Sequence, residues 1–304
     1  MWQGPCGLIL GPIPVSGRHS CEGGNLQGDS PSLGVYNGKL RRCKVKKQML
    51  VAVVLAVLLA ASARAQTTDF FKLVTTGTPQ EVQAAIDKGE DVNANVPNDL
   101  TPLIAAAAFN KNPDVVATLL RAGADIEAQV GTAKFHGPHD ATALIWAAWF
   151  NENPEVVARL LKSGADLSAK ESLNGGSALT CAAQYNQNPK VISALLKAGA
   201  DIEYRDKSGR TALIAACSDN PNLEVIIILL KAGAEAKAKD DNGWTPLIYA
   251  ASKSENPEVI FRLLKAGADA RAKNNKGYTA FDYAKYNDKL KGTDALKQLE
   301  KASK

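Results

Sequence analysis

Histidine is scarce in this sequence, and its scarcity narrows the chemistry that the chain can perform. Only three histidines occur in 304 residues, and only His136 and His139 follow the first 65. Catalysis needs a nucleophile, a base and an electrostatic stabiliser at compatible positions. The sequence shows no Ser/His/Asp set and no Gly-rich phosphate loop, because its glycines recur singly at turn positions. We therefore predict a protein that is not an enzyme and that needs no cofactor.

The five cysteines form neither a metal-binding nor a disulfide framework. Cys6, Cys21 and Cys43 lie in the first 44 residues, which leaves Cys181 and Cys217. These two replace small residues on neighbouring alanine-rich helical segments. Packed helices lie roughly 10 Å apart, whereas a disulfide requires Cα atoms within roughly 7 Å. We expect two buried thiols and no structural metal site.

The folded part of the chain also lacks a surplus of charge of either sign. The whole chain has 36 Lys and Arg against 31 Asp and Glu, but residues 1–65 hold eight basic and two acidic side chains. The remainder is therefore close to neutral, with 28 basic and 29 acidic residues. Because the excess of basic residues lies within residues 1–65, it does not indicate nucleic-acid binding by the folded part.

A membrane-spanning run is absent as well, and the longest apolar stretch predicts a signal peptide instead. Basic residues precede an apolar run over 49–61, and Ala63-Arg64-Ala65 follows it. The run is shorter than the roughly 20 residues that span a bilayer. We predict a signal peptide over 45–65 with cleavage after Ala65, a doubtful N-terminal extension over 1–44, and a folded domain over 66–304.

This leader predicts a periplasmic or secreted protein without a stable membrane anchor. No cysteine follows the predicted cleavage site, which argues against a lipid anchor. An alternative is that residues 1–44 form a true cytoplasmic tail on a signal anchor. In either case we expect the folded part to be exported.

The remaining sequence is dominated by one recurring unit, which is most legible in TPLIAAAAFNKNPDVVATLLRAGADIEAQ, residues 101–129. Each unit has a Thr or Ser start, an alanine-rich segment, a polar break, an apolar segment and a glycine stop. Successive stop glycines lie mostly 34 residues apart, a period that indicates stacked supersecondary units. The stop glycines are Gly89, Gly123, Gly164, Gly199, Gly233 and Gly267.

The composition of each unit predicts two helices joined by a turn. The start Thr suits a helix cap, and proline is tolerated in a first helical turn. Alanine pairs such as Ala106-Ala107 allow helices of adjacent units to approach closely. Apolar residues at i, i+1, i+4 and i+5, as in Val115, Val116, Leu119 and Leu120, form one stripe on the second helix. No single unit can bury that stripe, so the units must stack.

These motifs resemble the ankyrin repeat. The resemblance covers about residues 67–304 and implies an all-α solenoid of helix-turn-helix units with short hairpin finger loops, about seven repeats including caps. Repeat one starts near Thr67 and lacks Thr-Pro-Leu, as suits a cap, and Thr279 to Lys301 forms a polar C-terminal cap. The family's histidine after Thr-Pro-Leu is absent here, and we expect apolar packing to replace its tie between repeats.

The resemblance also implies a protein-binding role, on the concave face of the first helices and on the finger tips. We expect a monomer that binds a protein partner through aromatic residues, since such residues often anchor interfaces. Trp149 is the strongest candidate, because its counterparts in other repeats are small or polar. The predicted contact residues are Trp149, Phe150, Trp146, Phe109, Tyr185 and Tyr249.

Two alternatives to this interpretation stay open. Phe109, Phe150 and Tyr185 each precede an Asn-x-Asn-Pro segment, so they also fit a repeated packing role at the inter-helix turn. Ile227, Ile228 and Phe261 stand where other repeats have smaller or polar residues, and they are either an outward patch on the convex side or buried by a neighbour. The basic residues of the late finger tips are interleaved with acidic ones, which favours a solvated tip.

One insertion, roughly residues 130–140, lengthens the finger between the second and third repeats. Its residues Phe135, His136 and His139 are further candidates for partner contact. A metal- or small-ligand-binding accessory protein that uses this loop is an alternative function, since imidazole and carboxylate suit zinc or copper. A longer recognition loop is the simpler interpretation, and we predict no metal site. A secreted effector that binds host proteins is a third possibility.

Overall fold

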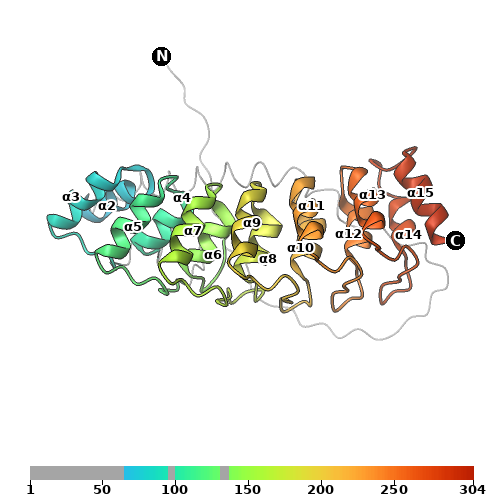
Figure 1. Ribbon diagram of the computed structural model, residues 1–304, viewed down its shortest axis with the longest axis horizontal. Coiled ribbons are helices and arrows are strands. Elements are labelled where there is room, and N and C mark those ends of the chain that lie inside the picture. The colour runs from blue at the N-terminus through green and yellow to red at the C-terminus, as the bar shows by residue number, and fades with distance from the viewer. Residues whose placement is uncertain (1–64, 95–99, 131–136) are drawn as a thin grey trace, which may run out of the picture. The chain divides into compact units, whose positions relative to one another are not determined.

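The structure, a computed structural model, describes residues 65–94, 100–130 and 137–304, all within one compact unit. These residues form seven helix-turn-helix pairs that follow one another in chain order, as Figure 1 shows. The predicted all-α repeat fold is thereby confirmed. The pairs are α2 (Ala65–Thr76) with α3 (Pro79–Asp87), α4 (Pro102–Phe109) with α5 (Pro113–Arg121), α6 (Ala143–Phe150) with α7 (Pro154–Lys162), α8 (Ala178–Tyr185) with α9 (Pro189–Lys197), α10 (Ala212–Asp219) with α11 (Leu223–Lys231), α12 (Pro246–Lys253) with α13 (Glu258–Lys265), and α14 (Ala280–Ala284) with α15 (Asp294–Ser303).

Local sequence signals place the helix ends. Thr101 Oγ1 accepts the backbone N–H of Ile104 at 3.3 Å, and equivalent bonds cap α8, α10, α12 and α14. Thr142 is the exception among the start residues, because its buried Oγ1 has no partner in the described part of the chain. The six stop glycines have φ between 89° and 100°, the left-handed region that ends a helix without a Cβ penalty.

The helices form two layers, because each first helix packs on the first helices of neighbouring pairs and each second helix on the neighbouring second helices. The alanine pairs are fully buried between first helices, as expected. Val115, Val116 and Leu119, with their counterparts in later pairs, fill the space between the layers. One core therefore runs through all the pairs, and no pair has a core of its own.

A polar tie joins successive repeats, which corrects the expectation that apolar packing alone replaces the missing histidine. The asparagine that ends a first helix donates both hydrogens of its amide to two backbone carbonyls of the preceding pair. Asn186 Nδ2, for example, lies 2.9 Å from the carbonyl oxygens of Ala148 and Asn151, while its Oδ1 accepts the N–H of Asn188. This asparagine ladder comprises Asn110, Asn151, Asn186, Asn220 and Asn287.

The asparagine ladder is interrupted at one junction, between α10/α11 and α12/α13. Ser254 stands at the ladder position, and its hydroxyl bonds only to the backbone of Asn256 in its own turn. A second set of asparagines, Asn153, Asn188 and Asn222, donates to a carbonyl of the preceding pair. Asn256 stands at that position in the sixth pair, and its side chain only accepts the backbone N–H of Glu258. This junction therefore lacks both asparagine ties in the described chain.

The finger loops are joined to one another by backbone hydrogen bonds. Lys207 N–H donates to the carbonyl of Asn174 at 2.8 Å, and the same step recurs from Asp241 to Ser208 and from Asn275 to Asn242. Inside each of the later fingers a carboxylate or amide, such as Asp206 or Asp240, accepts backbone N–H groups of the turn. The late fingers are thus ordered by side chains that point inward, toward their own backbone.

Three further expectations concern the two cysteines, a membrane-spanning helix and the predicted signal peptide. Cys181 and Cys217 are buried and unbridged, and burial raises the pKa of both thiols, so they stay protonated. No helix in the described ranges is both long and apolar enough to cross a membrane. The predicted signal peptide and the doubtful extension lie outside the described residues, except for Ala65 at the start of α2.

Candidate functional site

The predicted contact residues of the first helices occupy one set of equivalent positions, which we call the first-helix face. It comprises the positions four, seven and eight residues after the start residue of each first helix. Each of α4, α6 and α8 has at least one aromatic side chain at these positions. Helix α10 has only small and polar side chains there, and α12 has one aromatic and two polar ones. The residues at these positions are Ala105, Ala108 and Phe109; Trp146, Trp149 and Phe150; Cys181, Gln184 and Tyr185; Ala215, Ser218 and Asp219; Tyr249, Ser252 and Lys253.

Four aromatic side chains form a continuous aromatic ladder across α4, α6 and α8. The ring of Phe109 lies 5.9 Å from that of Phe150, which lies 5.8 Å from that of Trp149. Trp149 in turn stacks on Tyr185 with centroids 3.9 Å apart and planes 12° apart. All four are half-buried, and Phe109, Trp149 and Phe150 also pack against the core. The structure brings these predicted residues together, while their role as contacts stays a prediction.

Trp146 does not fit the predicted contact role, because only 1% of it is exposed. Its ring lies against the end of the inserted loop, where a Cβ on Gly137 would stand 2.8 Å from Cη2. The buried Nε1 has no hydrogen-bond partner among the residues described. Trp146 instead supports Phe150, whose ring lies 5.4 Å away.

Tyr249 belongs to a different aromatic group, which the sequence analysis did not identify. Its ring lies 4.8 Å from Trp244, and Trp244 lies 4.7 Å from Tyr283. The hydroxyl donates to Asp240 Oδ2 at 2.8 Å, and burial together with this carboxylate raises the pKa of Tyr249. The sequence does contain a pattern that indicates this group. Trp244 directly precedes the start residue of α12, and Tyr249 and Tyr283 each stand four residues after the start residue of their own helix.

Between the two aromatic groups lies a polar centre, defined as Gln184, Arg210, Ser218, Asp219 and Lys253. Gln184 Nε2 donates to Asp219 Oδ2 at 2.8 Å, while Lys253 Nζ donates to Ser218 Oγ at 2.9 Å and lies 3.6 Å from Asp219 Oδ1. These contacts join three successive first helices. The sequence alone predicts no such network, because the bonds connect different repeats.

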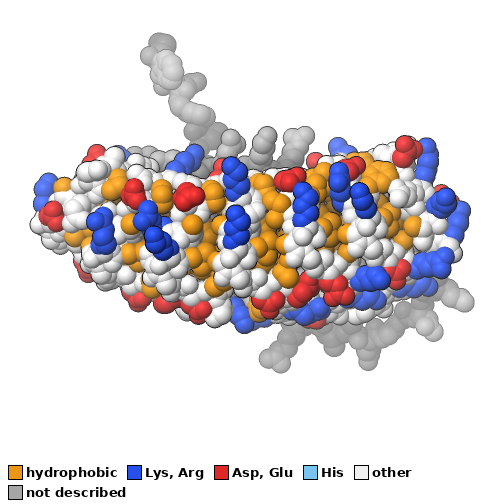
Figure 2. All heavy atoms as spheres, in the orientation of Figure 1, with side chains coloured by type: hydrophobic (Ala, Val, Ile, Leu, Met, Phe, Trp, Pro, Cys, Tyr) orange, Lys and Arg blue, Asp and Glu red, His pale blue; other side chains and the backbone are white. Residues whose placement is uncertain are grey.

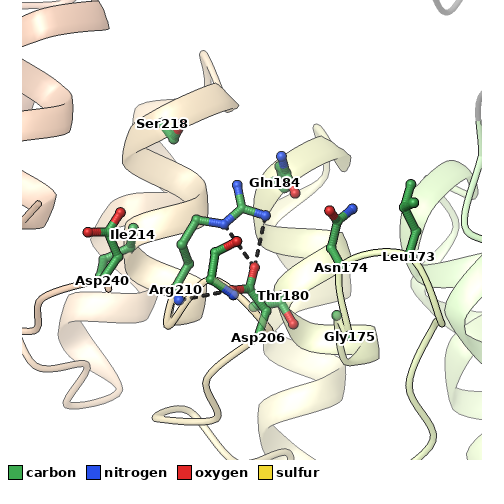
Figure 3. Close-up of polar contacts among 12 residues, drawn as sticks. Leu173, Asn174, Gly175, Thr180, Gln184, Asp206, Arg210, Ile214, Ser218 and Asp240 are labelled. Atoms are coloured by element: carbon green, nitrogen blue, oxygen red, sulfur yellow. Dashed lines mark hydrogen bonds and ion pairs between the residues drawn. The ribbon is translucent and has the colours of Figure 1, made fainter. Parts of the chain in front are cut away.

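Arg210 enters the polar centre from the finger before α10. Its Nε and Nη2 both contact Asp206 Oδ2 at 2.8 Å, as Figure 3 shows. Burial by itself lowers the pKa of Arg210, but Asp206, Asp219 and Tyr249 outweigh burial and raise it. The guanidinium therefore remains charged at a position where only 16% of the side chain is exposed.

The inserted loop is only partly described. Phe135 and His136 lie outside the described residues, whereas His139 is half-buried and its carbonyl accepts the N–H of Ser172 at 2.7 Å. Asp140 has a φ of 44° and accepts the Ser172 hydroxyl. Within the described ranges no group of three or more His, Cys, Asp or Glu side chains is placed to hold a metal ion.

The second-helix layer offers less specific features. Ile227, Ile228 and Phe261 are half-buried, so they are neither fully outward nor fully covered. On the face shown in Figure 2, hydrophobic side chains lie between spaced Lys and Arg side chains. A shallow hollow of about 910 Å³ between α3, α5 and α7 contains the ion pair of Arg159 and Asp114 at 2.9 Å. Arg121, which also lines the hollow, bonds to Ala117 and Thr118 of its own helix.

Comparison with known proteins gives consistent matches to one type of repeat. The family profile described as "Ankyrin repeats (3 copies)" matches residues 144–240 and 216–302, and the profile "Ankyrin repeat" matches 98–130. The crystal structure of the human ASB11 ankyrin repeat domain is similar with a TM-score of 0.64 and 24% identity, and the match covers 77% of this chain and 96% of that one. No curated protein sequence matches the chain closely enough to count as a relative.

Proposed function

This chain belongs to the ankyrin repeat family, whose repeats generally mediate protein–protein interaction, and from that premise we propose that it is a non-enzymatic binding protein that holds a protein partner on the first-helix face. We further propose that it acts outside the cytoplasm, after its leader has been removed at Ala65. Family membership supports the general role. The signal peptide predicted from the sequence and the aromatic ladder support the finer statements.

The observation that favours the first-helix face is the stacking of Trp149 on Tyr185. Packing within the repeat does not require a large ring at this position, because Ala108, Gln184, Ser218 and Ser252 occupy it elsewhere. A large, rigid, partly exposed aromatic surface gives an interface much contact area at low entropic cost. We therefore assign the principal apolar anchor of the partner to the aromatic ladder.

The test is a cross-linked pull-down from cells that express the full chain with a C-terminal tag. The site variant is the double substitution Trp149→Ala, Phe150→Ala, and the matched control is Phe261→Ala, a half-buried aromatic of the second-helix layer. Thermal unfolding of all three proteins checks that the fold is retained. We expect one partner to be captured by the wild type and the control and lost from the site variant. Equal capture by all three would move the site away from the first-helix face.

Fractionation tests the proposed location at the same time. The tagged protein is expected at the mass of residues 66–304 and outside the cytoplasm. Its recovery from the periplasm supports a resident binding protein, whereas its accumulation in the medium supports an effector that binds host proteins. Retention of the leader in the cytoplasmic fraction would contradict export.

A further inference from the structure

We propose that the polar centre is a carboxylate-binding subsite, which receives an acidic side chain of the partner while the aromatic ladder holds an apolar side chain of the same segment. This inference rests on the proposed function, because it specifies the chemistry of the partner on the first-helix face. The hydrogen-bonding capacity of the polar centre and the position of its donors support it.

The acceptor groups around the polar centre are already engaged. Asp206 Oδ1 accepts the N–H groups of Ser208 and Arg210, and its Oδ2 accepts the Arg210 guanidinium. Asp240 accepts two N–H groups of its own finger and the Tyr249 hydroxyl. Asp219 accepts Gln184 Nε2 on one oxygen and faces Lys253 with the other. Three carboxylates are present: five of their six oxygens accept a hydrogen bond, and the sixth, Asp219 Oδ1, lies 3.6 Å from the Lys253 ammonium.

Several donors, by contrast, have capacity left. Arg210 uses Nε and Nη2 on Asp206, so Nη1 has no partner among the described residues. Ser218 accepts from Lys253, which leaves its own hydroxyl hydrogen without an acceptor in the described chain, although only 7% of this residue is exposed. Lys253 contacts Ser218 and Asp219, and an ammonium has three hydrogens to donate. The unfilled requirement is therefore for an acceptor, and a carboxylate supplies the strongest one.

The aromatic ring that α6 and α12 carry on this face is missing in α10, which has a small residue there, as α4 and α8 do. Four residues after the start residue stand Trp146 in α6 and Tyr249 in α12, but Ala215 in α10. In the finger before α12, the Tyr249 hydroxyl donates to the carboxylate of Asp240. In the finger before α10, the Arg210 guanidinium donates to the equivalent carboxylate, that of Asp206. Figure 3 shows the guanidinium turned toward the side on which Gln184 and Ser218 lie.

The repeat spacing predicts the pattern of the partner segment. Successive first helices pack about 10 Å apart, and an extended peptide rises about 3.3 Å per residue. Ser218 lies one repeat beyond Tyr185 and two beyond Trp149. We therefore expect the acidic residue about three to six positions from the apolar anchor.

The experiment uses synthetic peptides and the protein purified after expression of the full chain. Each peptide has one Trp and one Glu at separations from one to eight in a Ser/Ala background, and each is matched by a peptide with Gln in place of Glu. Binding is measured by fluorescence anisotropy. We expect the Glu peptides to bind about tenfold more tightly than their Gln matches, with the largest ratio at separations of three to six and a smaller ratio in high salt.

Three variants separate this subsite from the aromatic ladder. Ser218→Ala and Arg210→Lys are expected to lower the Glu-to-Gln ratio toward one, because they weaken binding of the Glu peptides more than that of the Gln peptides. Trp149→Ala is expected to weaken both series equally. Melting temperatures near that of the wild type show that each variant is folded.

The outcomes distinguish the two proposals. Equal affinity for Glu and Gln peptides, with loss of both in Trp149→Ala, overturns the carboxylate subsite and leaves the first-helix face in place. Undiminished binding by Trp149→Ala overturns the aromatic anchor. Failure of every peptide to bind at millimolar concentration contradicts both.

Discussion

At the scale of single residues, the asparagine amide makes a set of hydrogen bonds between repeats that neither an apolar nor a hydroxyl side chain can make. One amide offers two donors and an acceptor, and Asn186 uses all three on backbone groups that its helix pair and the preceding one leave unpaired. Buried backbone groups without partners are strongly unfavourable. The asparagine ladder therefore stabilises the inter-repeat contacts in addition to the apolar core.

Asn186→Ala tests this role. The substitution leaves two carbonyls and one N–H without their partners, so we expect the free energy of unfolding to fall by about 3 kcal/mol. Denaturant unfolding followed by circular dichroism measures the change. Gln187→Ala is the matched control, because its side chain makes no inter-repeat bond in the described chain, and it should change stability by less than about 0.5 kcal/mol. A similar small change for both variants would mean that water replaces the amide without cost.

A second residue-scale prediction concerns Asp282, which forms a capping box with Thr279 at the start of α14. Burial by itself raises the pKa of Asp282, but hydrogen bonds from Thr279 and Lys285 outweigh it and lower the pKa. A carboxyl whose pKa is lower in the folded state stabilises the fold above its unfolded pKa of about 3.9. That stabilisation is lost as the pH falls through the folded value.

The comparison of wild type with Asp282→Asn at several pH values checks this sign. We expect the variant to be less stable by about 0.5–1 kcal/mol at pH 7, a small effect because the side chain is partly exposed. The difference should begin to shrink as the pH falls below the unfolded pKa of about 3.9, and it should disappear once the pH is below the lowered pKa of the folded state, where the wild-type carboxyl is protonated too. A difference of unchanged size across this whole pH range would show that the Asn variant disturbs packing, and not the charge of the cap.

At the scale of elements, the junction between α10/α11 and α12/α13 differs from the other junctions. It keeps the apolar contacts and the finger bond from Asp241 to Ser208 but lacks the asparagine ties. Lys253, which bonds Ser218 across the same junction, supplies a more exposed contact in their place. We infer that the two helix pairs separate here more readily than elsewhere.

Ser254→Asn is designed to complete the ladder. By analogy with Asn186, the new amide would reach the carbonyls of Cys217 and Asn220 and accept the N–H of Asn256. We expect a gain of about 1 kcal/mol in the free energy of unfolding and slower amide hydrogen exchange in α12. Unchanged exchange together with unchanged stability would mean that the junction is already as tight as its neighbours.

At the scale of the whole molecule, stability depends on the interfaces between repeats, and the end repeats close the core. The first helix pair covers α4 and α5 with Phe70, Val74 and Val82, while the last pair covers α12 and α13 with Leu290 and Leu299. In a linear array of this kind each repeat is stabilised mainly by its neighbours. Loss of an end pair therefore exposes a full apolar face.

Deletion of residues 279–304 is expected to make the protein aggregate at micromolar concentration, which light scattering measures. The intact protein is expected to unfold gradually or in one broad step, which calorimetry measures. Deletion of residues 301–304 alone removes only the mostly exposed end of α15 and should leave the protein soluble. A soluble, monomeric protein without residues 279–304 would contradict the assignment of a cap.

Much of the fold was predictable because its signals are local. The period of the stop glycines, the capping Thr residues and the paired apolar residues each act within a few positions of the chain, so the seven pairs and their buried faces agree with the sequence-based prediction. The weakest prediction was the tie between repeats. The Asn-x-Asn-Pro segment was recognised as a turn, but its amides bond to carbonyls more than 30 residues away.

The candidate site was predictable only as a set of positions. Sequence placed Trp146, Trp149 and Tyr249 on the same kind of helix, and it determined that such helices stack. Only the tertiary structure decided that Trp146 is covered beside Gly137, that Trp149 stacks on Tyr185 of the next repeat, and that Tyr249 turns to Asp240. The physical reason is that helix period and capping are properties of neighbouring residues, whereas burial and hydrogen-bond partners depend on which side chains the stacked repeats bring within a few ångströms.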